Sequence, residues 1–278
     1  MFSSVPGPIG IFDSGYGGLT IFDKIRAAMP GYDYIYLGDK ARSPFGTRSF
    51  EVVYRFTKQA VETLFNEGCQ LVILACNTAS AKALRTIQQR DLPQWDPARR
   101  VLGVIRPTVE LMDKISKSKH VGILGTTGTI TSDSYSLEIK KMFPHMTVTG
   151  EACPMWVPLV ENNEFDSPGA DYFVRKHLEH ILAADPEIDT LVLGCTHYPL
   201  LIEKIKAFLP EGITLFSQGE YVAASLTDYL RRHPEMDIRL TKQGNCRFLT
   251  TESAAKFSDA ASVFLNHPVE VEQIRLVE

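Results

Sequence analysis

Short apolar runs alternate with longer amphipathic stretches along this chain of 278 residues. A short apolar run bounded by turn residues predicts a buried strand, and the amphipathic stretch after it predicts a helix that packs on the sheet. The predicted strands are 8–12, 33–38, 70–75, 121–124, 190–193 and 246–250, and the predicted helices are 19–29, 49–66, 78–89, 132–143, 170–184, 221–232 and 252–265. The proline-containing segment 91–100 is predicted as a connector. This order of elements indicates an α/β fold with mostly parallel sheets.

The two halves of the chain carry similar strand–turn units. The segment 10–14 (GIFDS) is similar to 122–126 (GILGT), and the apolar run that leads into Cys76 is similar to the run that leads into Cys195. Each half therefore carries a strand, a polar turn and a helix, and later a strand that leads into a cysteine and a second polar turn. Chance similarity between two common strand–turn–helix units is the competing explanation.

Net charge narrows the classes of partner. The chain has 29 Lys and Arg against 33 Asp and Glu, a net charge of −4. A chain of this balance has no overall electrostatic attraction to nucleic acid or to an anionic membrane. No apolar stretch approaches the roughly 18 residues that a membrane span requires, and the first eight residues lack the pattern of a signal peptide. We therefore predict neither a nucleic-acid partner nor a membrane partner.

The cysteine content predicts a reducing compartment. The five cysteines are an odd number and include no closely spaced pair of the kind that binds zinc. We accordingly predict a cytoplasmic protein without a metal ion.

Polar residues follow several of the predicted strands directly. They are Asp13-Ser14, Cys76-Asn77-Thr78, Thr126 to Thr129 and Cys195-Thr196-His197. In open parallel sheets, ligands bind beyond the carboxyl ends of the strands, at the first turns of the following helices. The unpaired N–H groups there suit a carboxylate or a phosphate. These four segments are therefore the predicted ligand site.

Cys76 and Cys195 are the strongest candidates for chemistry, because they occupy matching positions in the two halves. A helix N-terminus is expected to lower the pKa of each thiol and to supply some thiolate near neutral pH. Two facing thiols could form a redox disulfide, bind a metal, or act as a paired acid and base. The pairing fits the third use, since inversion of a stereocentre needs a base on one face and an acid on the other. Cys69, Cys153 and Cys246 are predicted to be structural.

Two further side chains could act on these thiols. His197 follows Cys195 by two residues and could hydrogen-bond its thiol or tune its charge. Asp13 could hold a substrate ammonium or assist a thiol, and for both residues helix capping is the competing explanation. The segment 15–18 (GYGG) lacks the spacing of a dinucleotide-binding motif, and no GxxxxGK[ST] motif is present, so no nucleotide cofactor is predicted.

Four motifs together resemble those of the bacterial glutamate racemases. They are 12–19 (FDSGYGGL), 37–39 (LGD), 75–79 (ACNTA) and 193–201 (LGCTHYPLL). The segments 125–130 (GTTGTI) and 153–161 look like the same family. The resemblance extends from about residue 9 to residue 265.

This resemblance implies a cofactor-independent enzyme that interconverts L- and D-glutamate and supplies D-glutamate for peptidoglycan. It implies that Cys76 takes the α-proton from D-glutamate and that Cys195 takes it from L-glutamate. Asp13 is expected to assist Cys76, and His197 to assist Cys195.

The resemblance also implies a set of binding residues. Substrate contacts are expected from Asp13, Ser14, Pro44, Phe45, Gly46, Asn77, Thr78, Thr126, Thr129, Thr196 and His197, with Asp39 and Glu161 as auxiliary acidic residues. The resemblance implies two pseudo-symmetric domains, 1–103 plus 216–278 and 104–215, each a mostly parallel sheet flanked by helices, with the active site in the cleft between them. Glutamate is the expected partner, and a homodimer is the candidate assembly.

Three departures from the family pattern affect loops. The family usually has Tyr where this chain has Phe45, so a hydroxyl contact is missing. Pro107-Thr108 replaces the usual Pro-Gly, and 251–253 (TES) replaces a more typical Thr-Gly-Asp. These positions lie outside the cysteine motifs and affect local geometry rather than the chemistry.

Three other functions compete with the leading interpretation. An aspartate racemase has a similar two-cysteine plan, but typically has Glu where this chain has His197 and lacks the DSGxGGL motif. A non-catalytic amino-acid-binding protein would need no thiol on each side of its ligand. A thiol redox protein would form a disulfide between Cys76 and Cys195.

Overall fold

The computed structural model describes residues 5–265 and 267–276 of the chain. Its strands are β1 (Ile9–Asp13), β2 (Tyr34–Gly38), β3 (Leu71–Leu74), β4 (Arg100–Gly103), β5 (His120–Gly125), β6 (Thr147–Ala152), β7 (Thr190–Gly194), β8 (Thr214–Phe216), β9 (Cys246–Thr250) and β10 (Val271–Gln273). They form a six-stranded sheet in the order β10-β9-β2-β1-β3-β4 and a four-stranded sheet in the order β6-β5-β7-β8. All the strand pairs within these two sheets are parallel.

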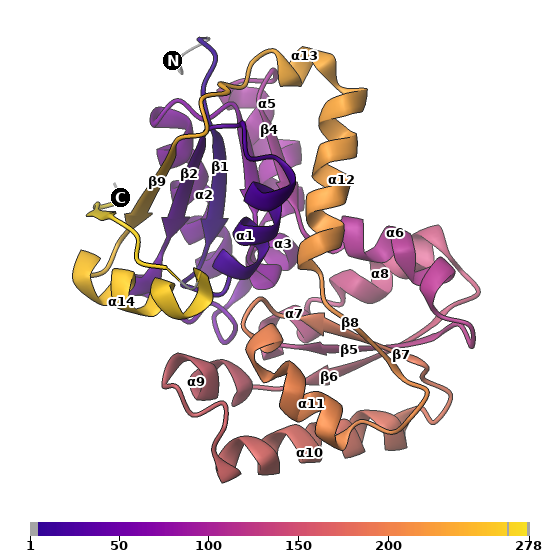
Figure 1. The fold of residues 1–278 in the computed structure, drawn as a ribbon. Helices are drawn as coiled ribbons and strands as arrows, with labels where there is room; N and C mark the ends of the chain where they lie inside the picture. Colours follow the sequence, from indigo (N-terminus) through magenta and orange to yellow (C-terminus); the bar gives the residue numbers. More distant parts are fainter. Residues whose placement is uncertain (1–4, 266, 277–278) are drawn as a thin grey trace.

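Helices connect the strands and pack on the sheets. They are α1 (Leu19–Ala28), α2 (Phe50–Asn66), α3 (Asn77–Lys82), α4 (Leu84–Thr86), α5 (Leu92–Trp95), α6 (Ile105–Ile115), α7 (Thr127–Thr131), α8 (Ser134–Met142), α9 (Trp156–Glu161), α10 (Pro168–Ala184), α11 (Ile202–Phe208), α12 (Gly219–Arg232), α13 (Pro234–Asp237) and α14 (Ala254–Leu265). The 3-10 helices η1 (Lys40–Arg42) and η3 (Tyr198–Leu201) and the π-type segment η2 (Ile87–Asp91) complete the set. The predicted α/β fold, with two mostly parallel sheets flanked by helices, is confirmed (Figure 1).

The two sheets share one connection pattern. In the first sheet β1 lies between β2 and β3, with β4 outside β3, and in the second sheet β5 lies between β6 and β7, with β8 outside β7. The similar segments 10–14 and 122–126 therefore fall on topologically equivalent strands, β1 and β5. Cys76 and Cys195 likewise follow equivalent strands, β3 and β7. The internal similarity of the sequence thus corresponds to a repeated topology.

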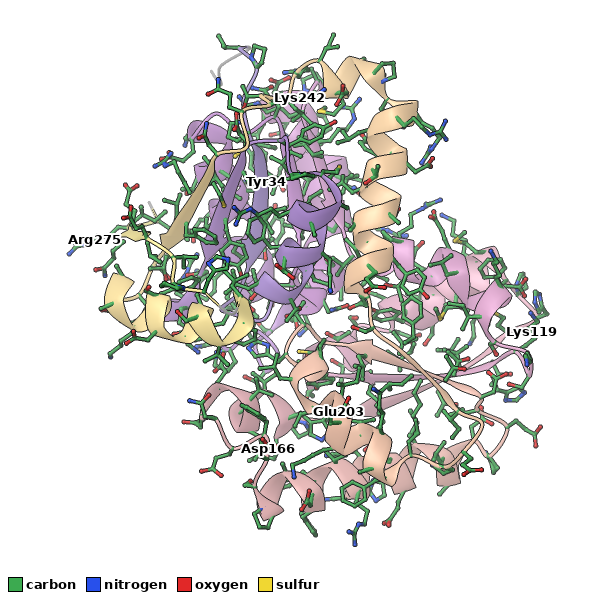
Figure 2. The ribbon with its side chains drawn as sticks, in the orientation of Figure 1. Tyr34, Lys119, Asp166, Glu203, Lys242 and Arg275 are labelled. Atoms are coloured by element: carbon green, nitrogen blue, oxygen red, sulfur yellow. The ribbon has the colours of Figure 1, made fainter. Side chains whose placement is uncertain are left out.

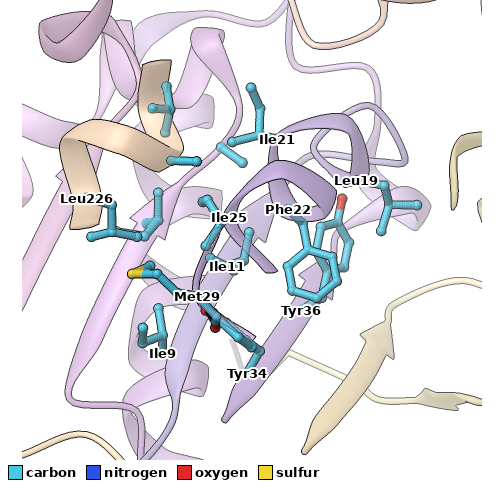
Figure 3. Close-up of a cluster of buried hydrophobic side chains, with 14 of the residues drawn as sticks. Ile9, Ile11, Leu19, Ile21, Phe22, Ile25, Met29, Tyr34, Tyr36 and Leu226 are labelled. Carbon is cyan, nitrogen blue, oxygen red and sulfur yellow. Dashed lines mark hydrogen bonds between the residues drawn. The ribbon is translucent and has the colours of Figure 1, made fainter. Parts of the chain in front are cut away.

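Apolar side chains fill both faces of each sheet. On one face of the first sheet, Phe22 and Ile25 of α1 are fully buried against β1 and β2, and Leu226 of α12 joins the same cluster (Figure 3). The rings of Phe22 and Tyr36 lie 5.8 Å apart between centroids. Burying one such side chain contributes about 1.5–3 kcal/mol, which explains why α1 and α12 are held together although their sequences are far apart.

The second sheet has the same layered arrangement. One face packs against α9, α10 and α11, and the other packs against α6 and α8. Charged residues such as Asp166 and Glu203 are exposed on the surface around this sheet (Figure 2). Tyr34, by contrast, is buried in β2 of the six-stranded sheet.

Two local predictions are corrected by the structure. The predicted helix 78–89 is broken into α3, α4 and η2, and the predicted connector 91–100 contains α5. The π-type segment η2 is anchored by a tertiary contact at its end, where the Asp91 carboxylate accepts a hydrogen bond from Tyr54 at 2.7 Å and pairs with Lys58 at 2.9 Å. Because Tyr54 and Lys58 are in α2, these contacts hold the π-type segment η2 against that helix.

Four strands were not predicted from the sequence. The short strands β4, β8 and β10 have three or four residues each, and β6 is a polar edge strand (TVTGEA) that lacks an apolar run. Among the described residues, no helix has both the length and the apolar composition to cross a membrane.

Candidate active site

A cavity of about 120 Å³ lies at the carboxyl ends of the strands of both sheets. Its walls come from the turns after β1, β2 and β3 on one side and after β5, β6 and β7 on the other. The lining residues are Ser14, Ser43, Pro44, Phe45, Gly46, Thr47, Cys76, Asn77, Thr78, Thr126, Thr127, Pro154, Val157, Pro158, Glu161, Cys195, Thr196 and His197. Most of the predicted site residues therefore meet at one cavity.

Cys76 ends the turn after β3 and is the N-cap residue of α3. Its sulfur accepts a hydrogen bond from the backbone N–H of Ala79 at 3.5 Å and lies 3.3 Å from the hydroxyl oxygen of Ser14. Burial raises the pKa of the Cys76 thiol to about 11, and the negative charge of Asp13 adds to this rise. The expected lowering of this pKa at a helix N-terminus is wrong, because the cost of burying a thiolate exceeds the gain from the two hydrogen bonds.

Cys195 occupies the equivalent place after β7. It is 7% exposed, and its sulfur lies 3.9 Å from Nδ1 of His197. Burial raises the pKa of the Cys195 thiol, and a charge on Cys76 would raise it further. The expected lowering is therefore wrong here as well. Cys76 and Cys195 both line this cavity.

His197 is oriented by an acidic residue from α9. Its Nε2 lies 3.2 Å from Oε1 of Glu161. A carboxylate only accepts hydrogen bonds, so it selects the tautomer with the proton on Nε2. The lone pair on Nδ1 of this tautomer then faces the Cys195 sulfur, which is the arrangement that a general base for this thiol requires.

Glu161 is in turn held by a cation from the first half of the chain. Its second oxygen, Oε2, lies 2.8 Å from Nζ of Lys40, and the ammonium group lies 4.9 Å from the centroid of the Tyr16 ring. Burial alone would raise the pKa of Glu161, but the hydrogen bond with His197 and the contact with Lys40 lower it to about 2. Glu161 is therefore ionised at neutral pH.

Asp13 ends β1 behind the cavity wall. Its Oδ2 accepts the N–H of Gly15 at 2.8 Å, and within the described part of the chain its Oδ1 has no hydrogen-bond partner. Burial raises the pKa of Asp13, and a positive charge on His197 would oppose this rise. A buried carboxyl group with a raised pKa keeps its proton to a higher pH than an exposed one.

The glycines after Asp13 permit close packing across the cavity. A β-carbon on Gly17 would overlap the imidazole of His197 and the hydroxyl of Thr196. The hydroxyl of Thr20 also donates to the carbonyl of Thr196 at 3.2 Å. The turn after β1 therefore fits directly against the turn after β7.

Three threonine hydroxyls form a cluster between the two sheets. The Oγ1 atoms of Thr78 and Thr126 lie 3.0 Å apart, and Oγ1 of Thr129 lies 3.3 Å from that of Thr78 and 3.1 Å from that of Thr126. Thr78 and Thr126 line the cavity, whereas Thr129 lies behind them. Such a cluster provides donors that can turn toward a substrate carboxylate.

Asn77 is held by a buried network from the second half of the chain. Its Nδ2 donates to Oε1 of Gln218 at 2.7 Å, and its Oδ1 accepts from the hydroxyl of Tyr135 at 2.6 Å. Gln218 donates in turn to Thr108 at 2.7 Å. This network is satisfied on both sides and holds the Asn77 side chain in one orientation at the cavity wall.

Two further expected residues have different surroundings. Phe45 lines the cavity but is 1% exposed, and its ring packs against Phe56 with centroids 5.7 Å apart. Asp39 does not line the cavity, because its carboxylate is engaged by Arg42 at 2.7 Å and by Thr251 at 2.9 Å. Asp39 thus fixes the η1 loop that leads to Phe45.

Sequence reasoning missed Lys40, Gln218 and Tyr135. Lys40 could have been noticed as the residue after the LGD motif, at the carboxyl end of a predicted strand. Gln218 and Tyr135 carry no comparable local signal. As for metals, in the segments 5–265 and 267–276 the cluster of three ligating side chains within mutual reach lies outside this cavity, at Glu151, His177 and His180.

The arrangement provides a thiol from each half of the chain, each with an acidic or basic neighbour, around one small cavity. Hydroxyl and amide groups supply the remaining polar surface. These groups can remove a proton from one side of a small bound molecule and deliver a proton from another, and they can hold its carboxylates by hydrogen bonds.

Two sequence comparisons with known proteins, one with a family model and one with individual relatives, both match racemases. A sequence model of the Asp/Glu/hydantoin racemase family matches residues 16–233. The chain is 39% identical over 272 residues to a glutamate racemase of Roseobacter denitrificans, covering 94% of this chain and 98% of that protein.

Solved structures agree over the whole fold. Glutamate racemase isoform RacE1 from Bacillus anthracis superposes with a TM-score of 0.87 at 34% identity, covering 97% of this chain and 98% of that chain. A glutamate racemase from Francisella tularensis, solved in complex with D-glutamate, superposes with a TM-score of 0.86 at 31% identity, covering 98% of both chains.

Proposed function

The chain belongs to the Asp/Glu/hydantoin racemase family, within which its relatives are glutamate racemases, and on this premise we propose that it interconverts L- and D-glutamate with Cys76 and Cys195 as paired acid and base. It is an amino-acid racemase. The observation that carries the two-thiol mechanism is the position of these cysteines after equivalent strands of the two sheets, at one cavity. Inversion requires groups on opposite sides of one carbon, and a repeated topology supplies such groups.

The proposed reaction moves one proton in and one proton out. In the direction from L- to D-glutamate, the Cys195 thiolate takes the α-proton, and the electron pair of the broken C–H bond stays on the substrate. The Cys76 thiol then donates its proton to the opposite face of the same carbon and becomes a thiolate. The reverse direction exchanges these roles. The proton count of substrate and enzyme together is unchanged, so no external reactant is needed.

Each thiol must lose its proton before it can act, and its neighbours support this step. We propose that Nδ1 of His197 accepts the proton of Cys195, with the resulting positive charge stabilised by Glu161. Asp13 serves Cys76, whose charge it influences from behind the cavity wall. The raised thiol pKa values make the thiolates strong bases, which favours removal of the weakly acidic α-proton once they form.

Substrate carboxylates are proposed to bind to hydroxyl and amide groups at the cavity. Ser14, Thr78 and Thr126 present hydroxyls there, and Asn77 and Thr196 add amide, hydroxyl and backbone groups. Pro44, Phe45 and Gly46 form the part of the wall next to Thr126, where the carbonyl of Gly46 accepts the N–H of Gly128 at 2.6 Å. Thr129 would support Thr78 from behind.

The proposed domain boundaries, biological role and assembly rest on the resemblance to the family. We propose that 1–103 with 216–278 and 104–215 form the two domains between which the substrate binds. We propose that the enzyme acts in the cytoplasm and that the D-glutamate it forms is used for peptidoglycan synthesis. A homodimer remains the candidate assembly.

Hydrogen exchange at the α-carbon tests this function. Each glutamate enantiomer is incubated with the enzyme in D2O, and proton NMR and polarimetry are recorded together. We expect both enantiomers to racemise and the product to carry deuterium. Faster turnover of L-aspartate than of L-glutamate would overturn the substrate assignment. Glutamate binding without exchange would instead favour an amino-acid-binding protein.

A further inference from the structure

A second cluster of chemically active side chains lies on the outer side of the second sheet. Glu151 is in β6, and His177 and His180 are one turn apart in α10. Oε1 of Glu151 lies 2.6 Å from Nδ1 of His177 and 3.6 Å from Nδ1 of His180. One possible ligand atom from each residue lies within 4.8 Å of the other two. We propose that these three side chains bind a zinc ion.

The local structure explains why they meet. Residues three apart in a helix share a face, so His177 and His180 both lie on the side of α10 that meets β6. His177 is packed edge-on against Trp156, with ring centroids 6.1 Å apart, and only 8% of its side chain is exposed. The side chain of His180 is 63% exposed. The cluster therefore has a fixed inner ligand and an outer ligand that solvent can reach.

The distances fit a zinc ion after a small adjustment. Bond lengths of about 2.0–2.2 Å to nitrogen and oxygen place tetrahedral ligand atoms about 3.3 Å apart. The separation of 3.6 Å between Glu151 and His180 is close to this value. The separation of 2.6 Å between Glu151 and His177 must widen by less than 1 Å to reach this value. Zinc then takes the place of the shared proton.

The donor set selects the class of metal. Two imidazoles and one carboxylate are ligands that zinc and neighbouring transition metals prefer, whereas magnesium and calcium take oxygen ligands. With three protein ligands, the fourth position is left to water on the exposed side. The bound ion would tie α10 to β6, which continues through Cys153 to Pro154 at the cavity wall. We assign the ion a stabilising role, separate from the reaction.

Thiols also bind zinc, so the test removes the two cysteines that line the cavity and the partly exposed Cys246. Zinc chloride is titrated by calorimetry into the Cys76→Ser/Cys195→Ser/Cys246→Ser variant, and cobalt chloride is titrated while visible absorption is recorded. We expect one zinc ion per chain, a cobalt spectrum without thiolate charge-transfer bands, and a higher melting temperature with zinc. Because this background lacks both catalytic thiols, the result is independent of the proposed racemisation.

Two histidine substitutions decide the assignment. His180→Gln in the same background should weaken zinc binding about tenfold or more and abolish the rise in melting temperature. His145→Gln is the matched control, since His145 is an exposed histidine paired with Asp113 elsewhere on the second half. Unchanged binding in His180→Gln, or no binding in the parent variant at millimolar zinc, would overturn the proposal.

Discussion

The ammonium group of Lys40 lies 2.8 Å from the carboxylate of Glu161, and this ion pair joins the loop after β2 to helix α9. Both side chains are largely shielded from water, with 20% and 16% of their surface exposed. The pair thereby connects the two halves of the chain at the edge of the cavity. It also leaves the other oxygen of Glu161 directed at His197.

Removal of this cation should weaken catalysis without removing a reacting group. We expect Lys40→Met to lower kcat/KM roughly fivefold, the equivalent of about 1 kcal/mol for a partly shielded ion pair. The loss should be equal in both directions, because mirror-image substrates have equal energies and the overall equilibrium constant is fixed. Initial rates with each enantiomer check this. Lys58→Met, which removes a half-buried ion pair with Asp91 in the first sheet's outer layer, is the control and should leave kcat/KM unchanged.

Lys40→Met should also change how the free energy of unfolding depends on pH in acid. Glu161 has a pKa of about 2 in the folded protein, below the value of about 4.3 for an unfolded chain, so its stabilising contribution is present above that higher value and is lost as the pH falls toward 2. In Lys40→Met the folded pKa should rise, so this contribution shrinks. Urea unfolding between about pH 2 and pH 6 should show a smaller pH dependence in the variant than in the parent. An identical dependence would contradict this account of Glu161.

Gly17→Ala should damage the site through packing. The added methyl group would occupy the place of the His197 imidazole and the Thr196 hydroxyl, so His197 must move away from Cys195. A displacement of about 1 Å in a catalytic group can cost roughly 10²-fold in rate, and we expect a loss of this order in kcat. Gly31→Ala is the control, since a β-carbon there meets nothing within 4 Å in the described structure. Equal activity of the two variants would show that the turn after β1 does not position His197.

Isotope exchange should distinguish the role of Cys76 from the role of Cys195. We expect Cys76→Ala and Cys195→Ala to fold and to lose racemisation, because one side of the carbon then has no acid or base. Cys76→Ala should still exchange the α-hydrogen of L-glutamate slowly, with retention, through Cys195. Cys195→Ala should do the same with D-glutamate. Proton NMR in D2O measures both, and racemisation at the parent rate in either variant would contradict the assigned roles.

Thiol burial should make stability fall at alkaline pH. The pKa of Cys76 is raised to about 11 when folded, against about 8.5 for an unfolded cysteine, so its contribution is complete below the lower value and is lost as the pH rises through the higher one. A rise of this size corresponds to about 3 kcal/mol. The free energy of unfolding, measured with urea from about pH 8 to pH 11, should fall less steeply in Cys76→Ser than in the parent protein.

Phe45→Tyr tests the departure from the family pattern. The Phe45 ring is held by Phe12 and Phe56, so an added hydroxyl would extend from a fixed ring beside the cavity. One added hydrogen bond contributes about 1 kcal/mol, and we therefore expect KM for glutamate to change by less than about fivefold. Steady-state kinetics with both enantiomers measure the effect. A much larger gain in affinity would show that the hydroxyl is a principal substrate contact.

The sequence alone determined the fold class and the location of the thiols. The strands β1, β3 and β7 are continuous apolar runs that only a sheet covered on both faces can bury. Their ends are marked by polar residues within the same short segments, so the places of Cys76 and Cys195 follow from local pattern. Parallel pairing then brings these ends to one edge of each sheet.

Tertiary structure decided how those groups are coupled. The contact of Lys40 with Glu161 and the network of Asn77 with Gln218 join residues more than one hundred positions apart, which no local pattern encodes. The thiol pKa values depended on burial by surrounding elements, so a rule based on the helix N-terminus alone gave the wrong direction. Burial and long-range pairing are properties of the assembled chain, because they arise from which surfaces lose their water when both sheets and their helices pack together.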